Sequence, residues 1–424
     1  MRYLLVSLFT LFSFSIIGQI NFDTYFLPKT LRFDYTTGGN SDTSVVYFEQ
    51  LKEEPFWGGS KKNLLDIFNY GDYRLQVFDS TGKVMIYSRG FSTLFREWLD
   101  TDEAKKISRS YYGSVVMPYP KQKVWIQLQN RDRKQVFHTV YKQLVDPSDY
   151  FINKEQVKQY KTEKMLYSGD PAIKLDIVVL PEGYTAEEMD KFRNDTKRFI
   201  NYFFKVSPFK ENKDKFNFWS VLAPSVESGT DIPGDNIWKN TILNSNFYTF
   251  NSERYLTTRD VKQIRDLAAH VPYDQIYILV NSTKYGGGGV YNYYNLCTSD
   301  NAESEEVFTH EFGHAFAALG DEYEYGYDKA EDLYDMKVEP WQVNLTNLVD
   351  FSSKWKNLVD KNTPLPTPTS EQYKKKVGAF EGAGYVQKKI YRPVFDCKMR
   401  SNATKDFCPV CYDAVLKMLK FYTE

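Results

Sequence analysis

Histidine is scarce in this chain of 424 residues, which has only His138, His270, His310 and His314. Cysteine is equally rare, and the formal net charge of −1 leaves no excess of either sign. Without a strong overall field, the chain is a poor candidate for binding nucleic acid or an anionic membrane, and we expect neither as a partner. The content of 42% hydrophobic and 26% charged residues excludes a disordered chain, a coiled coil and a collagen-like fibre.

Long hydrophobic runs are also missing. Spanning a bilayer takes about 20 apolar residues, and no segment of the sequence reaches that length. The chain nevertheless begins with a basic Met1-Arg2 pair, a mostly apolar and uncharged run over residues 3–17, and Gly18. This order is typical of a secretory signal peptide, so we predict one over residues 1–18 and expect a secreted or periplasmic protein. The alternative is an N-terminal anchor or a buried helix.

The four cysteines all lie in the second half of the chain, and Cys397, Cys408 and Cys411 are close in sequence. Exported proteins keep disulfides, so we expect disulfide bonds, with three possible pairings left open. The alternative is a structural zinc site with four thiolate ligands that includes the Cys408–Cys411 pair. The second CxxC pair that is usual in such sites is missing.

Residues 19–150 have the pattern of an all-β domain. The alternating run from Tyr73 to Phe78 is followed by the turn residues 79–82, which predicts a hairpin. Further short β-rich segments at close spacing, without a helical period, predict a β-sandwich. This domain holds no cluster of potential catalytic groups, and His138 is alone in a predicted strand, where we expect a structural role. We therefore expect the domain to position or protect rather than to catalyse.

A polar stretch over residues 151–164 is the predicted linker to a second domain over residues 165–424, and we expect the two domains to have independent cores. The nearly continuous apolar run 175–180 predicts a strand that is buried on both faces. Helical spacing follows over 185–204, and strands and helices then alternate up to a long helix predicted over 303–319. This order predicts an α/β (α+β) domain.

The most informative motif lies in this last helix, where residues 310–314 read His-Glu-Phe-Gly-His. A helix places His310 and His314 on one face, with their Cα atoms about 6 Å apart along the axis. Two neutral imidazoles so placed can share one tetrahedral zinc ion, Zn2+. Glu311 can then take a proton from a zinc-bound water, whose pKa falls to about 7. We therefore assign Glu311 as the catalytic base of an HExxH motif and zinc as the cofactor.

A catalytic zinc ion needs a third protein ligand and an open fourth position. We expect the helix to end at Leu319-Gly320, because glycine commonly supplies the left-handed residue that follows a helix. The chain can then turn back toward the metal, and Asp321 is the predicted third ligand. The adjacent Glu322 is the alternative.

These residues resemble the pattern of the metzincin zinc peptidases, HExxHxxGxxH or Asp in the last place, which a Met-turn follows downstream. The segment 396–401 resembles the Met-turn, and the resemblance implies that Met399 lies beneath the metal. Two positions depart from the pattern. The third-ligand position holds Gly320, one residue before Asp321, and the usual glycine position holds Ala317.

A longer resemblance, over about residues 165–424, is to the IgA-peptidase family of bacterial secreted zinc metallopeptidases. It rests on the string HEFGHAFAALGDEY and on residues 175–184, 284–289, 380–385 and 391–393. The resemblance implies a metzincin-like catalytic domain behind an N-terminal β domain, zinc endopeptidase activity and a protein or peptide substrate. The family name implies immunoglobulin A or another host glycoprotein as that substrate.

Other residues have weaker claims on a substrate cleft. Gly286 and Gly287 precede the zinc helix and are predicted to form a sheet edge, on which an extended substrate can pair as an added strand. Tyr385 or Tyr391 is a candidate hydrogen-bond donor to the developing oxyanion. The acidic loop 227–235 could hold calcium, but it lacks the ordered EF-hand spacing, so we favour a solvated loop.

Three functions are compatible with the sequence. The first is a zinc endopeptidase in which Glu311 deprotonates water and returns the proton to the leaving amine. The second is a catalytically narrow or inactive metzincin-like module that binds a host glycoprotein, and the intact Glu311 argues against it. The third is a zinc hydrolase of a non-peptide bond, which the residues separate from the first only through the family resemblance.

Overall fold

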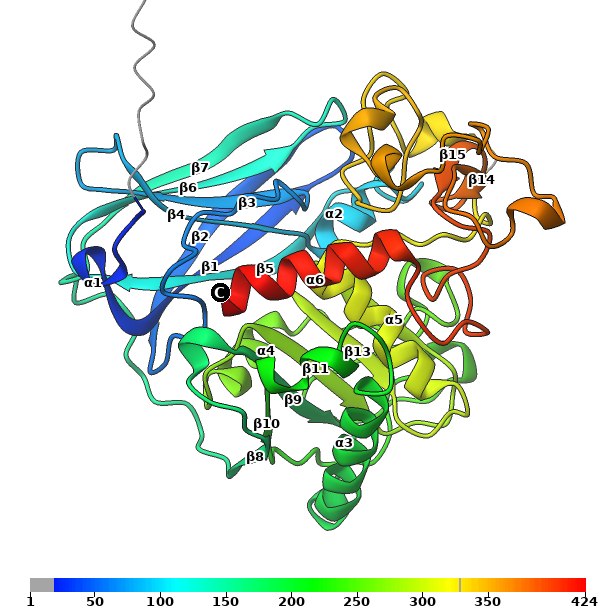
Figure 1. Ribbon diagram of the computed structural model, residues 1–424. Helices are drawn as coiled ribbons and strands as arrows, with labels where there is room; N and C mark the ends of the chain where they lie inside the picture. Colours follow the sequence, from blue (N-terminus) through cyan, green and yellow to red (C-terminus); the bar gives the residue numbers. More distant parts are fainter. Residues whose placement is uncertain (1–18, 328) are drawn as a thin grey trace, which may run out of the picture.

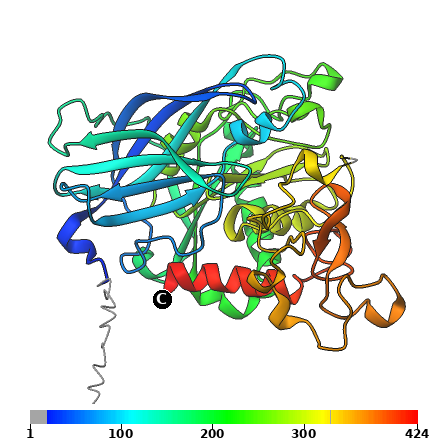
Figure 2. The same ribbon diagram turned by 90° about the horizontal axis from the view of Figure 1, so that it is seen from above.

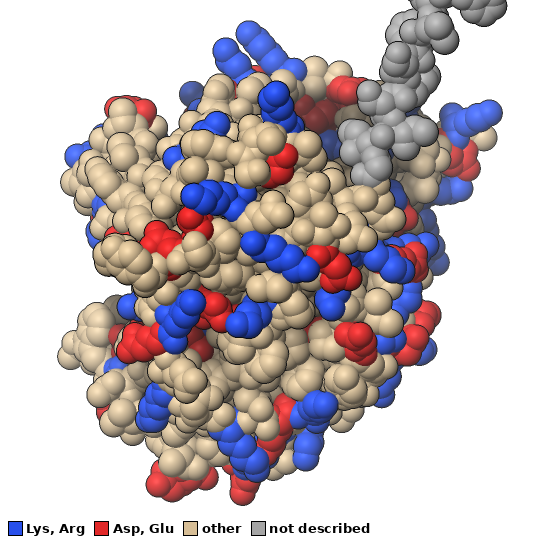
Figure 3. All heavy atoms as spheres, turned by 90° about the vertical axis from the view of Figure 1, so that its left-hand side faces the viewer, with Lys and Arg blue, Asp and Glu red and all other residues tan. Residues whose placement is uncertain are grey.

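The computed structural model describes residues 19–327 and 329–424, and the predicted signal peptide over residues 1–18 lies outside them. An N-terminal β-rich region is followed by an α/β region, which confirms the predicted mixed architecture (Figures 1 and 2). Within the described part, none of the helices combines the length and apolar character that crossing a bilayer requires. On the face shown in Figure 3, basic and acidic side chains are interspersed.

Two antiparallel sheets form the N-terminal region, with strand orders β2-β1-β5 and β4-β3-β6-β7. The elements of this region are α1 (Phe22–Tyr25), β1 (Phe26–Gly39), β2 (Ser44–Glu54), β3 (Tyr73–Phe78), β4 (Met85–Phe91), α2 (Leu94–Leu99), β5 (Arg109–Pro120), β6 (Val124–Arg131) and β7 (Phe137–Val145). Apolar side chains from both sheets share one core. The predicted hairpin joins β3 to β4, where Asp79 Oδ1 accepts hydrogen bonds from the backbone of Lys83 and Val84.

A six-stranded sheet with the order β12-β13-β11-β9-β10-β8 is the centre of the second region. Its strands are β8 (Thr162–Leu166), β9 (Leu175–Glu182), β10 (Phe216–Val221), β11 (Gln275–Val280), β12 (Gly287–Val290) and β13 (Tyr294–Thr298). The four inner strands are parallel, and the edge strands β8 and β12 run antiparallel to their neighbours. β8 takes up residues 162–164 of the predicted linker. Every residue of β9 is buried, because both faces of the sheet are covered.

The helices that cover the sheet come from both regions. α3 (Met189–Phe203), α5 (Ser304–Ala317) and α6 (Pro409–Thr423) share a core with one face. The opposite face packs against α4 (Val261–Ala268) and against α2 of the N-terminal region, whose Trp98 is only 1% exposed. The expectation of two independent cores is therefore wrong, because apolar side chains of α2 complete the core of the α/β region.

Buried charges also join the two regions. The guanidinium of Arg32 in β1 is fully buried and pairs with Asp34, Glu54 and, on α4, Asp266 at 2.9, 3.1 and 2.8 Å. Lys52 Nζ lies 2.8 Å from the same Asp266 carboxylate. Removing one partner from such a network leaves a buried charge unpaired, so the network disfavours separation of the two regions.

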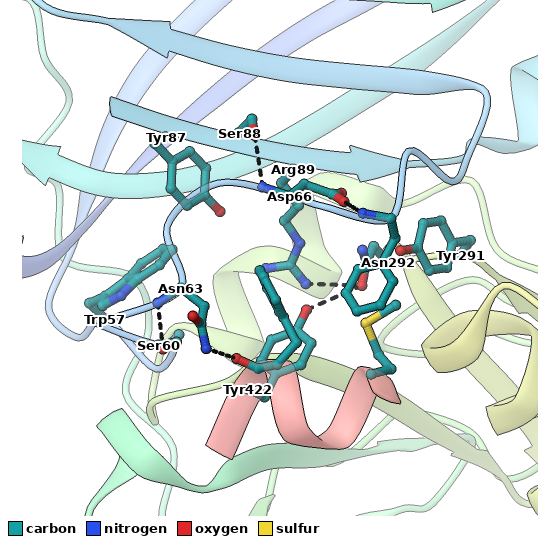
Figure 4. A pocket seen from close by; sticks show the side chains of 14 residues that line it. Trp57, Ser60, Asn63, Asp66, Tyr87, Ser88, Arg89, Tyr291, Asn292 and Tyr422 are labelled. Carbon is teal, nitrogen blue, oxygen red and sulfur yellow. Dashed lines mark hydrogen bonds between the residues drawn. The ribbon is translucent and has the colours of Figure 1, made fainter. Parts of the chain in front are cut away.

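The C-terminal helix α6 lies along the boundary between the regions (Figure 1). A cavity of about 30 Å³ lies there (Figure 4). The residues that line it include Trp57, Asp66, Arg89, Asn292 and Tyr422. Arg89 donates a hydrogen bond to Asn292 Oδ1 at 3.2 Å in this cavity. This volume admits one or two water molecules, so the cavity is too small for a peptide substrate.

Candidate metal centre

Helix α5 brings His310 and His314 together, as their spacing predicted. The Nε2 atoms of the two rings are 3.0 Å apart. The helix ends earlier than expected, because Ala318 rather than Gly320 takes the left-handed conformation, with φ of +58°. Gly320 has a packing role instead, since a Cβ atom there would lie 2.7 Å from Leu345 Cδ1.

Asp321 completes a compact group of three potential ligand atoms. Its Oδ1 lies 3.1 Å from His310 Nε2 and 3.2 Å from His314 Nε2, and its side chain is 5% exposed. A tetrahedral zinc ion with bonds of about 2.0 Å would hold its ligand atoms about 3.3 Å apart. The triangle therefore has the size that zinc requires. The alternative ligand, Glu322, lies outside this group.

Two backbone carbonyl groups orient the imidazoles. His310 Nδ1 lies 2.9 Å from the Lys398 carbonyl oxygen, and His314 Nδ1 lies 2.6 Å from that of Leu319. Because a carbonyl oxygen only accepts, each Nδ1 donates its proton and each Nε2 keeps a lone pair that faces Asp321. Two lone pairs and a carboxylate oxygen at this spacing repel one another unless a cation lies between them. This donor set fits a divalent metal ion.

The charges of the group shift its pKa values. Burial alone would raise the pKa of Asp321, but the imidazoles of His314 and His310 hold it well below its usual range. Burial alone would lower the pKa of His314, but the Asp321 carboxylate raises it to about 9. A proton and a metal ion therefore compete for the same atoms, and metal binding at neutral pH releases a proton.

Glu311 is half-buried and follows His310 on α5. Burial raises the pKa of its carboxyl group, and the two neighbouring imidazoles oppose this rise. A Cβ atom placed on Gly287 of β12 would lie 2.8 Å from Glu311 Oε1, so a glycine leaves room for this carboxylate. A carboxylate with a raised pKa beside two potential metal ligands is suited to general-base catalysis.

Of the two glycines predicted at the cleft, Gly287 faces Glu311 of α5, whereas Gly286 faces Phe247 on the opposite side of the sheet. The carbonyl oxygen of Gly287 already accepts a hydrogen bond from the backbone N–H of Leu256 at 3.2 Å. A Cβ atom on Gly286 would lie 2.7 Å from the carbonyl oxygen of Arg254. Gly286 therefore permits close approach of the Arg254 backbone, while the outer edge of β12 is already paired at Gly287.

Met399 is fully buried beneath α5. A Cβ atom placed on Gly313, between the two histidines, would lie 2.8 Å from Met399 Sδ. The Met399 carbonyl oxygen accepts a hydrogen bond from the backbone N–H of Glu322 at 2.8 Å, and the preceding carbonyl group, of Lys398, orients His310. The segment 396–401 thus supports both the helix and the loop that carries Asp321.

Tyr385 also reaches the site, from the turn between β14 (Phe380–Ala383) and β15 (Val386–Arg392). Its hydroxyl group donates a hydrogen bond to Asp321 Oδ2, the oxygen that does not face the histidines. Tyr391, the alternative donor, lies further along β15, where it pairs with β14. Of the two tyrosines, the structure brings only Tyr385 to the centre.

One neighbour of the site comes from the region in which we expected no catalytic cluster. Glu97 on α2 accepts a hydrogen bond from the hydroxyl group of Tyr255. Burial raises the pKa of Glu97 to about 7, and Tyr255 and the charge of the nearby His314 oppose this rise. No local pattern in the sequence marks Glu97, because its position depends on how α2 packs against the sheet.

One other expectation, that of disulfide bonds, is not met. All four cysteines lie in the described part of the chain and are free, so the predicted disulfide bonds are absent. Cys297 is buried in β13, while Cys397, Cys408 and Cys411 gather around Glu322. Among residues 19–327 and 329–424, this cluster and the histidine group are the two that could hold a metal ion, and the acidic loop 227–235 contributes to neither.

Two family models match the chain. The model described as IgA Peptidase M64 matches residues 164–375 and 369–419, and the model described as Peptidase M64 N-terminus matches residues 21–142. The first match includes α5 and the Met399 segment, and the second covers nearly all of the N-terminal β-rich region. No curated protein matches the chain.

Proposed function

Because the chain belongs to the IgA Peptidase M64 family of metallopeptidases, we propose that it is a secreted or periplasmic zinc-dependent endopeptidase. The observation that carries the proposal is the triangle of His310, His314 and Asp321, with Glu311 beside it. A zinc ion held there would polarise the scissile carbonyl group and acidify a water molecule to a pKa near 7.

Glu311 supplies the proton chemistry in this proposal. Its carboxylate takes the proton from the attacking water and later returns it to the leaving amine. A base works best when its pKa lies near the operating pH, and burial moves the pKa of Glu311 in that direction. One side chain thereby serves as the general base of the first step and the general acid of the second.

We assign Tyr385 to Asp321 rather than to the oxyanion of the substrate. Its hydroxyl group donates to Asp321 Oδ2 and leaves Oδ1 directed at the histidines. A hydrogen bond to a ligand carboxylate fixes the orientation of that ligand and tunes its affinity for the metal. Tyr385 is therefore a positioning residue in this proposal.

We also propose that the catalytic region is metzincin-like. Support comes from the position of Met399 beneath α5 and from the aspartate that follows the helix. The metzincin pattern places the third ligand one residue earlier, at the position of Gly320. The left-handed turn at Ala318 directs the chain so that Asp321, and not its neighbours, reaches the imidazoles.

The proposed substrate is a protein or peptide. Immunoglobulin A, a host glycoprotein, is the first candidate to test, because the family description names it. The proposed export rests on the sequence pattern of residues 1–18. Gly287 forms part of the wall beside Glu311, and we assign neither Gly287 nor Gly286 a hydrogen bond to the substrate.

The proposal is tested by profiling the cleavage products of a peptide library and of immunoglobulin A. The purified protein is compared with a chelator-treated sample and with the same sample after zinc is restored. We expect chelation to abolish cleavage and zinc to restore it. Cleavage by protein whose metal has been shown to be removed would refute the zinc mechanism, and binding without cleavage by the zinc-loaded protein would favour a binding module.

A further inference from the structure

We propose that Cys397, Cys408, Cys411 and Glu322 form a second metal site, which holds a structural zinc ion. The four side chains come from three separate segments: the loop after α5, the segment around Met399 and the start of α6. All four are buried, and their potential ligand atoms lie within 4.8 Å of one another. This site is separate from the histidine centre and does not depend on the proposed function.

The spacing of the sulfur and oxygen atoms fits a metal ion. Cys397 Sγ lies 3.9 Å from Cys411 Sγ, and Cys411 Sγ lies 3.3 Å from Glu322 Oε1. Tetrahedral zinc, with bonds of about 2.3 Å to sulfur and 2.0 Å to oxygen, would set these separations at about 3.8 and 3.5 Å. A covalent disulfide would need its two sulfur atoms about 2.05 Å apart.

The carboxylate of Glu322 provides an independent observation. Its side chain is fully buried, and Oε1 accepts a hydrogen bond from Asn344 Nδ2 at 2.8 Å. Oε2 is buried without a hydrogen-bond partner among the described residues. A buried carboxylate with an unsatisfied oxygen is costly unless a positive charge lies close by, and a divalent cation held by the three thiolates supplies that charge.

The start of α6 favours thiolates at this place. Cys408 is the residue that precedes the helix, and Cys411 lies in its first turn, where the helix dipole stabilises negative charge. The backbone N–H of Cys408 also points at Cys397 Sγ, at 3.3 Å. Zinc binding would release the thiol protons to solvent, and the N–H groups at the helix start would stabilise the remaining negative charge.

The location of the cluster gives the second ion a function. Glu322 directly follows Asp321, and Cys397 directly precedes Lys398, whose carbonyl group orients His310. An ion bound by both residues would fix the loop of the third ligand to the segment beneath α5. We therefore infer that the second site braces the histidine centre and takes no part in the reaction itself.

Metal analysis of the full-length exported protein, purified without reductant, tests the proposal. We expect about two zinc ions per chain in the parent, about one in Cys408→Ser, about one in His314→Ala, and about two in Cys297→Ser, whose cysteine is equally buried but lies outside the cluster. Because cleavage is not measured, a failure of the peptidase proposal leaves this test intact. A parent with the same zinc content as Cys408→Ser would overturn the second site.

A second measurement keeps the test decisive if Cys408→Ser does not fold. The parent is denatured with chelator, and its accessible thiols are alkylated and counted by mass spectrometry. We expect four alkylated cysteines, and zinc–sulfur scattering at about 2.3 Å in the X-ray absorption spectrum of the native protein. Two alkylated cysteines, with a disulfide-linked peptide among Cys397, Cys408 and Cys411, would show that oxidation and not metal joins this cluster. A lack of zinc–sulfur scattering would also overturn the second site.

Discussion

Replacement of Glu311 by glutamine tests the chemistry of the proposed centre most directly. Glutamine keeps the size and shape of the side chain, so it fits the space that Gly287 leaves beside Glu311 Oε1. The imidazoles of His310 and His314 and the Asp321 carboxylate are unchanged. An amide, however, does not take a proton from water at neutral pH.

The expected loss follows from the magnitude of general-base catalysis, which is about 10²- to 10⁴-fold, or about 3–5 kcal/mol in the activation barrier. The structure offers Glu97 as another carboxylate near His314, but the Tyr255 hydroxyl group already binds it. We therefore expect no rescue by Glu97. Glu311→Gln should fold, keep its metal, still bind the substrate and cleave it at least about a hundredfold more slowly.

The assay is hydrolysis of a peptide from the library profile, with variant and parent at equal zinc occupancy. Glu305→Gln is the matched control, because Glu305 lies on the same helix and its one ion pair among the described residues is a long contact of 3.4 Å with Arg198. The control should cleave at the parental rate. If Glu311→Gln also cleaves at the parental rate with its metal bound, Glu311 is not the base and the mechanism is wrong.

Three further predictions concern the ligand, the shared core and pH. Asp321→Asn should lower zinc affinity at the histidine centre by about 10-fold or more in a chelator competition, and unchanged affinity would exclude Asp321 as a ligand. Trp98→Ala should lower the free energy of unfolding by about 3–5 kcal/mol in urea titrations, because Trp98 fills the shared core. A fragment over 165–424, which lacks α2, should aggregate for the same reason. A soluble, zinc-binding fragment would show that α2 is dispensable. The pKa of Glu97 rises from 4.5 to about 7 on folding, so the folded state binds more protons than the unfolded state between these pH values. The free energy of unfolding should therefore fall as pH rises through this window. Glu97→Gln should flatten that dependence in unfolding titrations at pH 5 to 8.

Several features of the fold could be predicted because they depend on neighbours in the sequence. The continuous apolar run of β9 and the alternating run of β3 reflect how many faces of each strand are covered. The spacing of His310 and His314 is also a local signal, since any helix brings residues four apart onto one face. The hairpin after β3 follows from turn residues that bind their own backbone.

Other features could not be predicted because they depend on segments that are distant in sequence. Tyr385 contacts Asp321 from 64 residues away, and Glu97 approaches His314 from the other region of the chain. Sequence spacing alone left Asp321 and Glu322 as alternatives. The left-handed turn at Ala318 and the packing of Asn344 direct one carboxylate to the histidines and the other to the cysteines.

The sequence by itself therefore determined the α/β order, the helix with two histidines and a base, and the family resemblance, because local periodicity and motif spacing encode them. The tertiary structure decided which carboxylate joins the histidines, which tyrosine holds it, that the two regions share a core, and that three cysteines gather around Glu322. These outcomes depend on long-range packing, in which each contact is set by the burial of many side chains at once and leaves no local pattern in the sequence.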